Sequence, residues 1–289
     1  MPHGRQQFTI GSMFAGIGGF DLGFERAGWA TRWQIEINPA LRALLAARFP
    51  RARRFEDVRF CRGDELAKVD CITAGFPCQD LSQSGSRRAG GIRGLEGERS
   101  GLFWEVIRLL REVRPQWVVL ENVTGMLHAR TGRDFETVVN ALGDSGYVGF
   151  WRVLDAEYFG VPQKRRRVFL VAGRQQLPPL ELLADALPVE GLPIAIAPAL
   201  VRAADSWAGH TLLAVPSACA IALGSAVLVA EADRWRAMAQ RARNARLHGI
   251  RLGLDGPNLL VRHAAGNAVV PACAEWIARH LTRAMVRCN

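Results

Sequence analysis

Two residues in the first half of the chain have side chains suited to covalent catalysis, a cysteine and a glutamate. Cys78 follows Pro77 at the end of the apolar run C-I-T-A-G-F, and Glu121 directly follows the apolar run W-V-V-L. A thiolate can add to an electrophilic carbon while a nearby carboxylic acid supplies a proton. Cys78 would otherwise be a small buried hydrophobic residue, and Glu121 a capping or surface acid. A carboxylate at the edge of a core strand is costly without a function, which favours the catalytic pair.

A glycine-rich segment, F-A-G-I-G-G-F-D, lies near the N-terminus, after the first expected strand. Gly16, Gly18 and Gly19 permit a tight turn and let backbone N–H groups approach a ligand closely. Asp21 stands at the third glycine position of the dinucleotide-binding pattern. The segment alone therefore fits a ligand-binding loop and a turn made for packing equally well.

Two acids lie where a nucleoside ligand would need them. Glu36 is seventeen positions after Gly19, at the end of the second expected strand, and can accept hydrogen bonds from both hydroxyls of a ribose. Asp57 and Val58 follow in the next connection, where a carboxylate can bind the amino group of adenine and an apolar side chain can cover one face. Each acid alone also fits an ordinary surface position. Because they occur at successive strand ends, they predict an adenosine-containing ligand.

A basic run, Q-K-R-R-R, leads into the apolar strand V-F-L-V. Side chains alternate along a strand, so Arg165 and Arg167 share one face, and Lys164 and Arg166 share the other. Arginine guanidiniums can bind a base edge or a phosphate with paired donors. A basic run is usually a solvated surface, but the adjoining core strand favours a functional role here.

The elements that must position these residues alternate between short apolar runs and longer amphipathic ones. We expect strands at residues 8–14, 33–37, 69–74, 117–120 and 167–172, and helices at residues 20–27, 39–48, 102–112 and 135–142. This alternation predicts a Rossmann-like, doubly wound and mostly parallel α/β sheet. The carboxyl ends of its strands meet at one edge, which is where the candidate residues fall.

Three segments are expected along the chain. Residues 1–173 form a catalytic and cofactor-binding domain, and residues 174–261 form a short, irregular recognition region in which prolines interrupt an Ala/Leu-rich sequence. Residues 262–289 return to the first domain with a turn and a helix at residues 272–285. Residues 234–251 contain six arginines and no acid, which fits either phosphate contacts or one exposed helix face.

The chain has 289 residues, a net charge of +10 and a pI of about 10.3. This charge indicates a polyanionic partner such as nucleic acid, or else a solvated basic surface. The six cysteines form no C-x-x-C pair, so no metal site and no disulfide framework are expected. The N-terminus lacks a signal peptide, and the uncharged residues 212–230 contain Pro216 and Gly224, so we expect a cytoplasmic protein without membrane spans.

The motifs F-A-G-I-G-G-F, E-I-N, A-G-F-P-C-Q-D-L-S, E-N-V, Q-K-R-R-R and G-N-A-V-V-P stand in the order found in DNA cytosine-5 methyltransferases. The chain resembles the bacterial and phage members of this family over residues 8–173 and 262–285. The resemblance implies methyl transfer from S-adenosylmethionine to carbon 5 of a cytosine flipped out of double-stranded DNA. In that reaction Cys78 adds to carbon 6 and Glu121 protonates or hydrogen-bonds N3.

The resemblance also assigns the remaining site residues. It places Arg165 and Arg167 near the active site, with Arg167 the better candidate for contacting the flipped base. The cofactor-binding positions that it implies, together with the adenosine residues above, are Phe14, Gly16, Ile17, Gly18, Gly19, Glu36, Ile37, Asp57, Val58, Pro77, Leu102, Asn267 and Val269. No metal is implied.

The chain departs from the family pattern at several positions. Ser12 and Asn38 stand where the family usually has Asp, and E-D-V replaces G-D-I. The pattern R-x-x-Q-G-F-P is missing from residues 174–261, where R-N-A-R-L-H-G-I-R at residues 243–251 is the nearest candidate.

The sequence leaves four functions to be compared. The first is a monomeric DNA methyltransferase that serves in restriction–modification or in the protection of phage DNA. In a restriction–modification system its functional counterpart would be a restriction endonuclease. The second is an enzyme of the same fold acting on RNA cytosine, and the third a catalytically weak DNA- or cofactor-binding protein. A nicotinamide-dependent oxidoreductase would explain the glycine loop but neither P-C-Q nor E-N-V.

Overall fold

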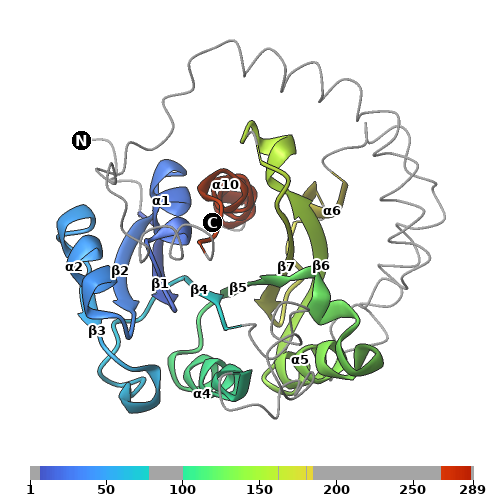
Figure 1. Ribbon diagram of the computed structural model, residues 1–289, viewed down its shortest axis with the longest axis horizontal. Helices are drawn as coiled ribbons and strands as arrows, with labels where there is room; N and C mark the ends of the chain where they lie inside the picture. Colours follow the sequence, from blue (N-terminus) through green and yellow to red (C-terminus); the bar gives the residue numbers. More distant parts are fainter. Residues whose placement is uncertain (1–6, 78–99, 162, 180, 185–267, 288–289) are drawn as a thin grey trace.

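The computed structural model describes residues 7–77, 100–161, 163–179, 181–184 and 268–287. These residues form a seven-stranded sheet in the order β3-β2-β1-β4-β5-β7-β6 (Figure 1). All neighbouring strands from β3 to β5 are parallel, whereas β7 is antiparallel to both β5 and β6. The prediction of a Rossmann-like, mostly parallel α/β sheet is confirmed.

The strands are β1 (Thr9–Met13), β2 (Ala30–Ile35), β3 (Arg53–Phe55), β4 (Cys71–Gly75), β5 (Trp117–Val123), β6 (Tyr147–Asp155) and β7 (Arg166–Arg174). The α-helices are α1 (Gly19–Arg26), α2 (Pro39–Arg48), α4 (Phe103–Val113), α5 (Arg133–Asp144), α6 (Glu181–Ala184) and α10 (Pro271–Arg287). Short 3-10 helices lie between them, of which η1 (Val58–Phe60), η3 (Ser100–Leu102) and η6 (Ala156–Phe159) border the candidate site.

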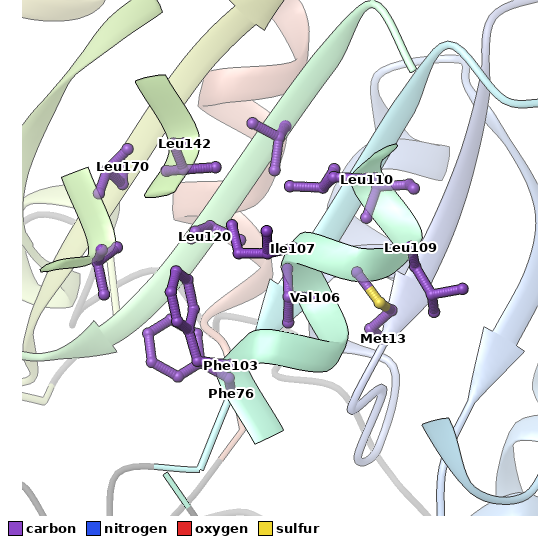
Figure 2. Packing of buried hydrophobic residues seen from close by; sticks show 14 of the residues in the cluster. Met13, Phe76, Phe103, Val106, Ile107, Leu109, Leu110, Leu120, Leu142 and Leu170 are labelled. Carbon is purple, nitrogen blue, oxygen red and sulfur yellow. The ribbon is translucent and has the colours of Figure 1, made fainter. Parts of the chain in front are cut away.

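Helices cover both faces of the sheet (Figure 1). Helix α4 repeats apolar residues at helical spacing and buries Phe103, Val106, Ile107 and Leu110 against the sheet, together with residues of α5. Figure 2 shows this layer, in which the side chains of α4 lie among Met13, Leu120 and Leu170 of the strands. A strongly apolar face of this kind anchors α4 and fixes the position of its N-terminus, where Leu102 lies.

The opposite face is covered by α1 and α10, although these helices are far apart in the sequence (Figure 1). An added Cβ atom at Gly23 would lie 2.5 Å from the Pro271 carbonyl oxygen and 2.6 Å from the Ala274 Cβ atom, so a glycine is needed at this crossing. The Trp29 indole N–H donates to the Thr282 hydroxyl at 2.7 Å. The C-terminal segment is thereby held on the same sheet as the N-terminal glycine loop.

The helix at residues 39–48 begins as its sequence predicts. The Asn38 side chain accepts hydrogen bonds from the N–H groups of Ala40 and Leu41, and Pro39 occupies the first turn. The other predicted helices also occur, with ends shifted by a few residues.

The structure has two strands that were not predicted, and a third that is longer than expected. The sequence did not predict β3 or β6, and β5 was expected to end at Leu120 but extends to Val123. Strand β6 lies at the sheet edge, where its partly exposed residues give no continuous apolar run. Gly149 interrupts the apolar residues of this strand further. A glycine is needed there because an added Cβ atom would lie 2.0 Å from the Val171 carbonyl oxygen.

No helix in the described part of the chain combines the length and apolar character needed to cross a membrane. The uncharged segment at residues 212–230, the arginine-rich segment at residues 234–251 and all of the expected recognition region after residue 184 lie outside the described residues.

Candidate active site

Glu121 lies inside β5 rather than after it. It is paired in register with Gly75 of β4 and Phe169 of β7, and its side chain is 8% exposed. Burial raises the pKa of the Glu121 carboxyl to about 7, although the nearby guanidiniums of Arg167 and Arg165 lower it. A carboxyl with this pKa can hold a proton at neutral pH and give it to a base within reach.

Arg167 supplies the opposing charge. Its Nε atom lies 3.1 Å from the Glu121 Oε1 atom, and its Nη1 atom donates to the Arg166 carbonyl oxygen. Arg166 is exposed, whereas Arg167 is partly buried. The alternation expected for the basic run is therefore present, with Arg167 on the side of the carboxyl.

Arg165 connects the catalytic edge to the C-terminal segment. It is 8% exposed and lies just before β7, and its Nη2 atom donates to the Ala268 carbonyl oxygen at 2.6 Å. Its backbone N–H donates to the Asp155 carboxylate, which fixes the turn between β6 and β7. Arg165 thus has a structural partner that the sequence did not indicate, in addition to its electrostatic effect on Glu121.

Asn122 holds the start of the proline–cysteine loop. Its side-chain amide donates to the Phe76 carbonyl oxygen at 3.3 Å, and its side-chain oxygen accepts from the Val123 N–H at 2.8 Å. Pro77 follows Phe76 and is partly buried, and Cys78 lies outside the described residues. From the sequence, Asn122 was named only within the motif E-N-V and was given no role of its own. The feature that could have indicated a role is an amide side chain next to the candidate acid at the end of an apolar run.

Val269 closes the catalytic edge from the C-terminal side. An added Cβ atom at Gly75 would lie 3.5 Å from both the Glu121 Oε2 atom and the Val269 Cγ2 atom. At Gly19 an added Cβ atom would lie 2.2 Å from the Val269 carbonyl oxygen, so the glycine loop and Val269 are in direct contact. The structure therefore brings together Gly19, Gly75, Glu121 and Val269, while Asn267 lies outside the described residues.

The three glycines of the N-terminal loop have different roles. Gly18 has a φ of +83° and an added Cβ atom would clash with Phe49 of the α2 side, and Gly19 packs on Val269. Gly16, with a φ of +57°, faces open space apart from one backbone oxygen at 4.0 Å. Gly16 thus adjoins open space that a ligand could fill, whereas Gly18 and Gly19 make packing contacts in addition to their predicted place in the cofactor loop.

Phe14 and Ile17 flank this loop. Phe14 has a φ of +53°, which is uncommon for a residue with a side chain and typical of functional loops. Phe14 packs partly against the core, and Ile17 is half-buried. Both predicted cofactor-binding residues are therefore close in the sequence to Gly16, which adjoins open space.

Glu36 joins the first two strand ends. Its Oε2 atom accepts a hydrogen bond from the Gly16 N–H at 2.8 Å, and its Oε1 atom accepts one from the Asn38 N–H at 2.9 Å. A carboxylate has about four acceptor positions, so two are left for ribose hydroxyls. Ile37, the next residue, is 60% exposed. These features fit a nucleoside with its ribose at Glu36 and its base beside Ile37.

Asp57 has a partner that the sequence did not predict. The Arg59 guanidinium donates to both oxygens of the Asp57 carboxylate, with distances of 2.6–3.0 Å, and the Arg59 N–H donates as well. This arrangement lowers the pKa of Asp57. These are four hydrogen bonds, two to each carboxylate oxygen, and the Nε–H is shared between both oxygens. The amino group of an adenine can therefore bind Asp57 by displacing one of these two shared contacts.

Val58 and Leu102 lie on the other side of this loop. Val58 is buried, and Leu102 at the end of η3 packs partly against the same hydrophobic cluster. The predicted adenosine-binding residues therefore gather at the ends of β1, β2 and β3. They adjoin the group around Glu121 through Gly19 and Val269.

Among the described residues, no group of three or more His, Cys, Asp or Glu side chains is arranged to hold a metal ion.

The curated proteins that this chain resembles include bacterial type II methyltransferases. The chain is 39% identical over 165 residues to the type II methyltransferase M2.BsuMI of Bacillus subtilis (strain 168), a match covering 56% of this chain and 41% of that protein. It is 36% identical over 168 residues to the type II methyltransferase M.Bsp6I of Bacillus sp. (strain RFL6), covering 57% and 52%. The chain spans about half the length of the curated relatives it matches.

A solved structure described as a DNA modification methyltransferase encoded within an Escherichia coli prophage matches at 25% identity with a TM-score of 0.45. That match covers 58% of this chain and 47% of the other. A family model described as C-5 cytosine-specific DNA methylase matches residues 8–194, which include the glycine loop, the proline–cysteine motif, Glu121 and the basic run. The chain therefore belongs to the C-5 cytosine-specific DNA methylase family.

Proposed function

We propose that the protein transfers a methyl group from S-adenosylmethionine to carbon 5 of cytosine in double-stranded DNA. One observation carries this proposal: a buried carboxyl, Glu121, has a pKa raised to about 7 and lies beside the strand that leads into Pro77-Cys78. Membership of the DNA methylase family supports the same reaction. A hydride-transfer enzyme would need neither the acid nor the thiol.

The cofactor is assigned to the loops at the ends of β1, β2 and β3. Glu36 would bind the ribose, Asp57 the adenine amino group, and Ile37 and Val58 the faces of the base. The remaining assigned positions are Phe14, Gly16, Ile17, Gly18, Gly19, Pro77, Leu102, Asn267 and Val269. When bound, S-adenosylmethionine supplies an electrophilic methyl group on sulfonium sulfur.

The chemistry requires Cys78 and Glu121 to act together. The Cys78 thiolate forms a bond to carbon 6 of the cytosine, while Glu121 donates its proton, or a hydrogen bond, to N3. A proton given to N3 returns to Glu121 when the adduct later breaks down. Carbon 5 thereby gains the electron density needed to take the methyl group, and S-adenosylhomocysteine is released. A base then removes the proton from carbon 5, and the bond between sulfur and carbon 6 breaks to restore the thiolate.

Access to carbon 6 requires the cytosine to leave the base stack. Arg167, which lies beside Glu121, would contact the flipped base, and Arg165 would hold the C-terminal segment against it. The net charge of +10 favours binding to DNA phosphates. Residues 1–173 would form the catalytic domain, residues 174–261 the recognition region, and residues 262–289 the returning segment.

The biological setting that we propose is restriction–modification or protection of phage DNA. In a restriction–modification system the functional counterpart would be a restriction endonuclease that cleaves the same unmethylated sequence. We propose that the enzyme acts as a monomer in the bacterial cytoplasm.

Bisulfite sequencing of a plasmid from cells producing this chain tests the proposal, with Cys78→Ser as the matched control. We expect protected cytosines in one short sequence context, absent in the control. A folded protein that binds S-adenosylhomocysteine but protects no cytosine would overturn the DNA assignment. The same variants assayed on transfer RNA would then separate an RNA enzyme from a binding protein without catalytic activity.

A further inference from the structure

Two arginines outside the predicted site, Arg42 and Arg108, donate hydrogen bonds to backbone carbonyls of the adenosine loops. Arg42 lies on α2 and Arg108 on α4, on the two sides of these loops. We propose that Arg42 and Arg108 are positioning residues that hold the adenine-binding loops in their binding conformation and so determine selectivity for adenine. The inference rests on the proposed binding of S-adenosylmethionine.

Arg42 binds the loop after β2. Its Nη1 atom donates to the carbonyl oxygens of Glu36, at 2.9 Å, and Ile37, at 2.6 Å. Its Nη2 atom lies 3.2 Å from a carboxylate oxygen of Glu56, the residue before Asp57. One side chain thus connects the ribose-binding residue, the residue beside the base and the adenine-binding loop.

Arg108 binds the same adenine loop from the other side. Its Nη2 atom donates to the Val58 carbonyl oxygen at 2.9 Å, although the two residues are fifty positions apart. Glu105 and Glu112 hold the guanidinium from one turn before and one turn after on α4. Glu112 also accepts from the Gly63 N–H at 2.6 Å, so α4 binds the segment from Val58 to Gly63 at both ends.

These contacts differ from ordinary surface ion pairs. The side chains of Arg42 and Arg108 are 21% and 33% exposed, and their donors reach backbone carbonyls that lie after the ends of β2 and β3. Hydrogen bonds from charged donors are stronger than neutral ones, and a guanidinium can bind several acceptors in a fixed geometry. Loops beyond the strand ends lack the hydrogen bonds of the sheet, so such donors can determine their conformation.

Selectivity for adenine depends on this conformation. The Arg59 Nε–H is shared between both oxygens of the Asp57 carboxylate, and the amino group of adenine must approach closely enough to displace one of these two contacts. Val58 follows Asp57 directly, so a shift of the Val58 carbonyl moves the carboxylate relative to a base held beside Ile37. Loss of Arg42 or Arg108 should therefore reduce the contribution of the adenine amino group to cofactor affinity.

The test uses the full chain with Arg42→Gln and Arg108→Gln. Two variants serve as controls because they remove the same charge from exposed positions near the same helices: Arg51→Gln, after α2, and Arg111→Gln, on α4. Two ligands are titrated by calorimetry, S-adenosylhomocysteine and its analogue with hypoxanthine in place of adenine, which lacks the amino group. Melting temperatures are measured in parallel.

We expect each positioning variant to bind S-adenosylhomocysteine about 10-fold more weakly, because a charge-assisted hydrogen bond is lost. Binding of the hypoxanthine analogue should weaken less, so the ratio of the two dissociation constants falls toward one. The control variants should keep the wild-type ratio. Arg42→Lys should restore part of it, because an ammonium group can still donate to one carbonyl.

Two results would overturn the inference while leaving the proposed function intact. One is an unchanged ratio of dissociation constants in both variants. The other is an equal loss for both ligands together with a lower melting temperature, which is the result expected of a merely structural role. If the wild-type protein binds neither ligand, the assignment of the cofactor site fails, and the inference fails with it.

Discussion

The two halves of the candidate site are built in different ways. On the adenosine side, Glu36 and Asp57 are held by backbone N–H groups and by arginines near the surface. On the catalytic side, Glu121 is buried between Gly75 and Phe169 and is opposed by the charges of Arg165 and Arg167. On the adenosine side the contacts fix the positions of hydrogen-bond acceptors, whereas on the catalytic side burial and charge set the pKa of Glu121.

This difference follows from what each half must do. A nucleoside is bound by directed hydrogen bonds, so acceptors must be fixed in position but can remain partly solvated. A general acid that works near neutral pH needs its charged form disfavoured, which burial achieves at a cost in stability. Changes on the catalytic side should therefore affect the rate of methyl transfer, while changes on the adenosine side should affect cofactor affinity.

The largest effect is expected for Glu121→Gln. Glutamine keeps the shape but has no proton to donate, so kcat should fall by about 10²–10⁴-fold, the usual contribution of a general acid. Steady-state kinetics on duplex DNA measures this fall, and calorimetry should give an unchanged affinity for S-adenosylhomocysteine. A large loss of cofactor affinity instead would mean that the two halves are not separate.

The next effect is expected for Glu36→Gln. Both oxygens of the carboxylate accept backbone N–H groups, and glutamine has only one acceptor oxygen and a weaker attraction for ribose hydroxyls. Affinity for S-adenosylhomocysteine should fall about 10–100-fold, with kcat at saturating cofactor within a few-fold of wild type. An unchanged affinity would remove Glu36 from the ribose site.

A third prediction concerns how the free energy of unfolding depends on pH. It distinguishes Glu121, a catalytic carboxyl, from Asp21, a structural one. Asp21 is fully buried, accepts a hydrogen bond from Gln34 at 2.9 Å, and has a pKa raised by burial to about 6. Both Asp21 and Glu121 bind their proton more tightly in the folded state than in the unfolded state. Their presence therefore lowers the free energy of unfolding as pH rises, from about 4 to 6 for Asp21 and from about 4.5 to 7 for Glu121.

Asp21→Asn and Glu121→Gln should each raise the free energy of unfolding at pH 8, by roughly 3 kcal/mol. At pH 5 about half of that gain should remain for Asp21→Asn and about a quarter for Glu121→Gln. Denaturant unfolding at the two pH values measures both. Only Glu121→Gln should also lower kcat, whereas Asp21→Asn should keep it. Equal gains at pH 5 and pH 8 would contradict the assigned pKa shifts.

The smallest effect is expected for Arg59→Gln. The pair between Arg59 and Asp57 is two residues apart, and the arginine side chain is 54% exposed, so stability should change by less than about 1 kcal/mol. Freeing acceptor positions on Asp57 should tighten binding of S-adenosylhomocysteine by no more than about 3-fold. A 10-fold weakening in the same titration would instead make Arg59 part of the positioning group with Arg42 and Arg108.

Much of this site could be predicted from the sequence because its residues lie directly after apolar runs. The position of Glu121 after W-V-V-L predicted an acid at the edge of the core, and the alternation of Q-K-R-R-R predicted that Arg165 and Arg167 share one face. That this face meets Glu121 is seen only in the structure. The contacts of Arg42 and Arg108 could not be predicted, because they join carbonyls that only the folded chain brings near α2 and α4. The pairing of Asp57 with Arg59 was missed for a different reason, since a short-range ion pair leaves no periodic pattern.

The most direct test is to trap the covalent intermediate. Duplex DNA made with 5-fluorocytosine at every cytosine position covers all sequence contexts, and fluorine cannot leave carbon 5 as a proton does. In the presence of S-adenosylmethionine, the account predicts a denaturation-resistant complex whose cross-linked peptide contains Cys78, absent in Cys78→Ser and slow to form in Glu121→Gln. A folded, cofactor-binding protein that forms no such complex, or forms it through another cysteine, would contradict the account.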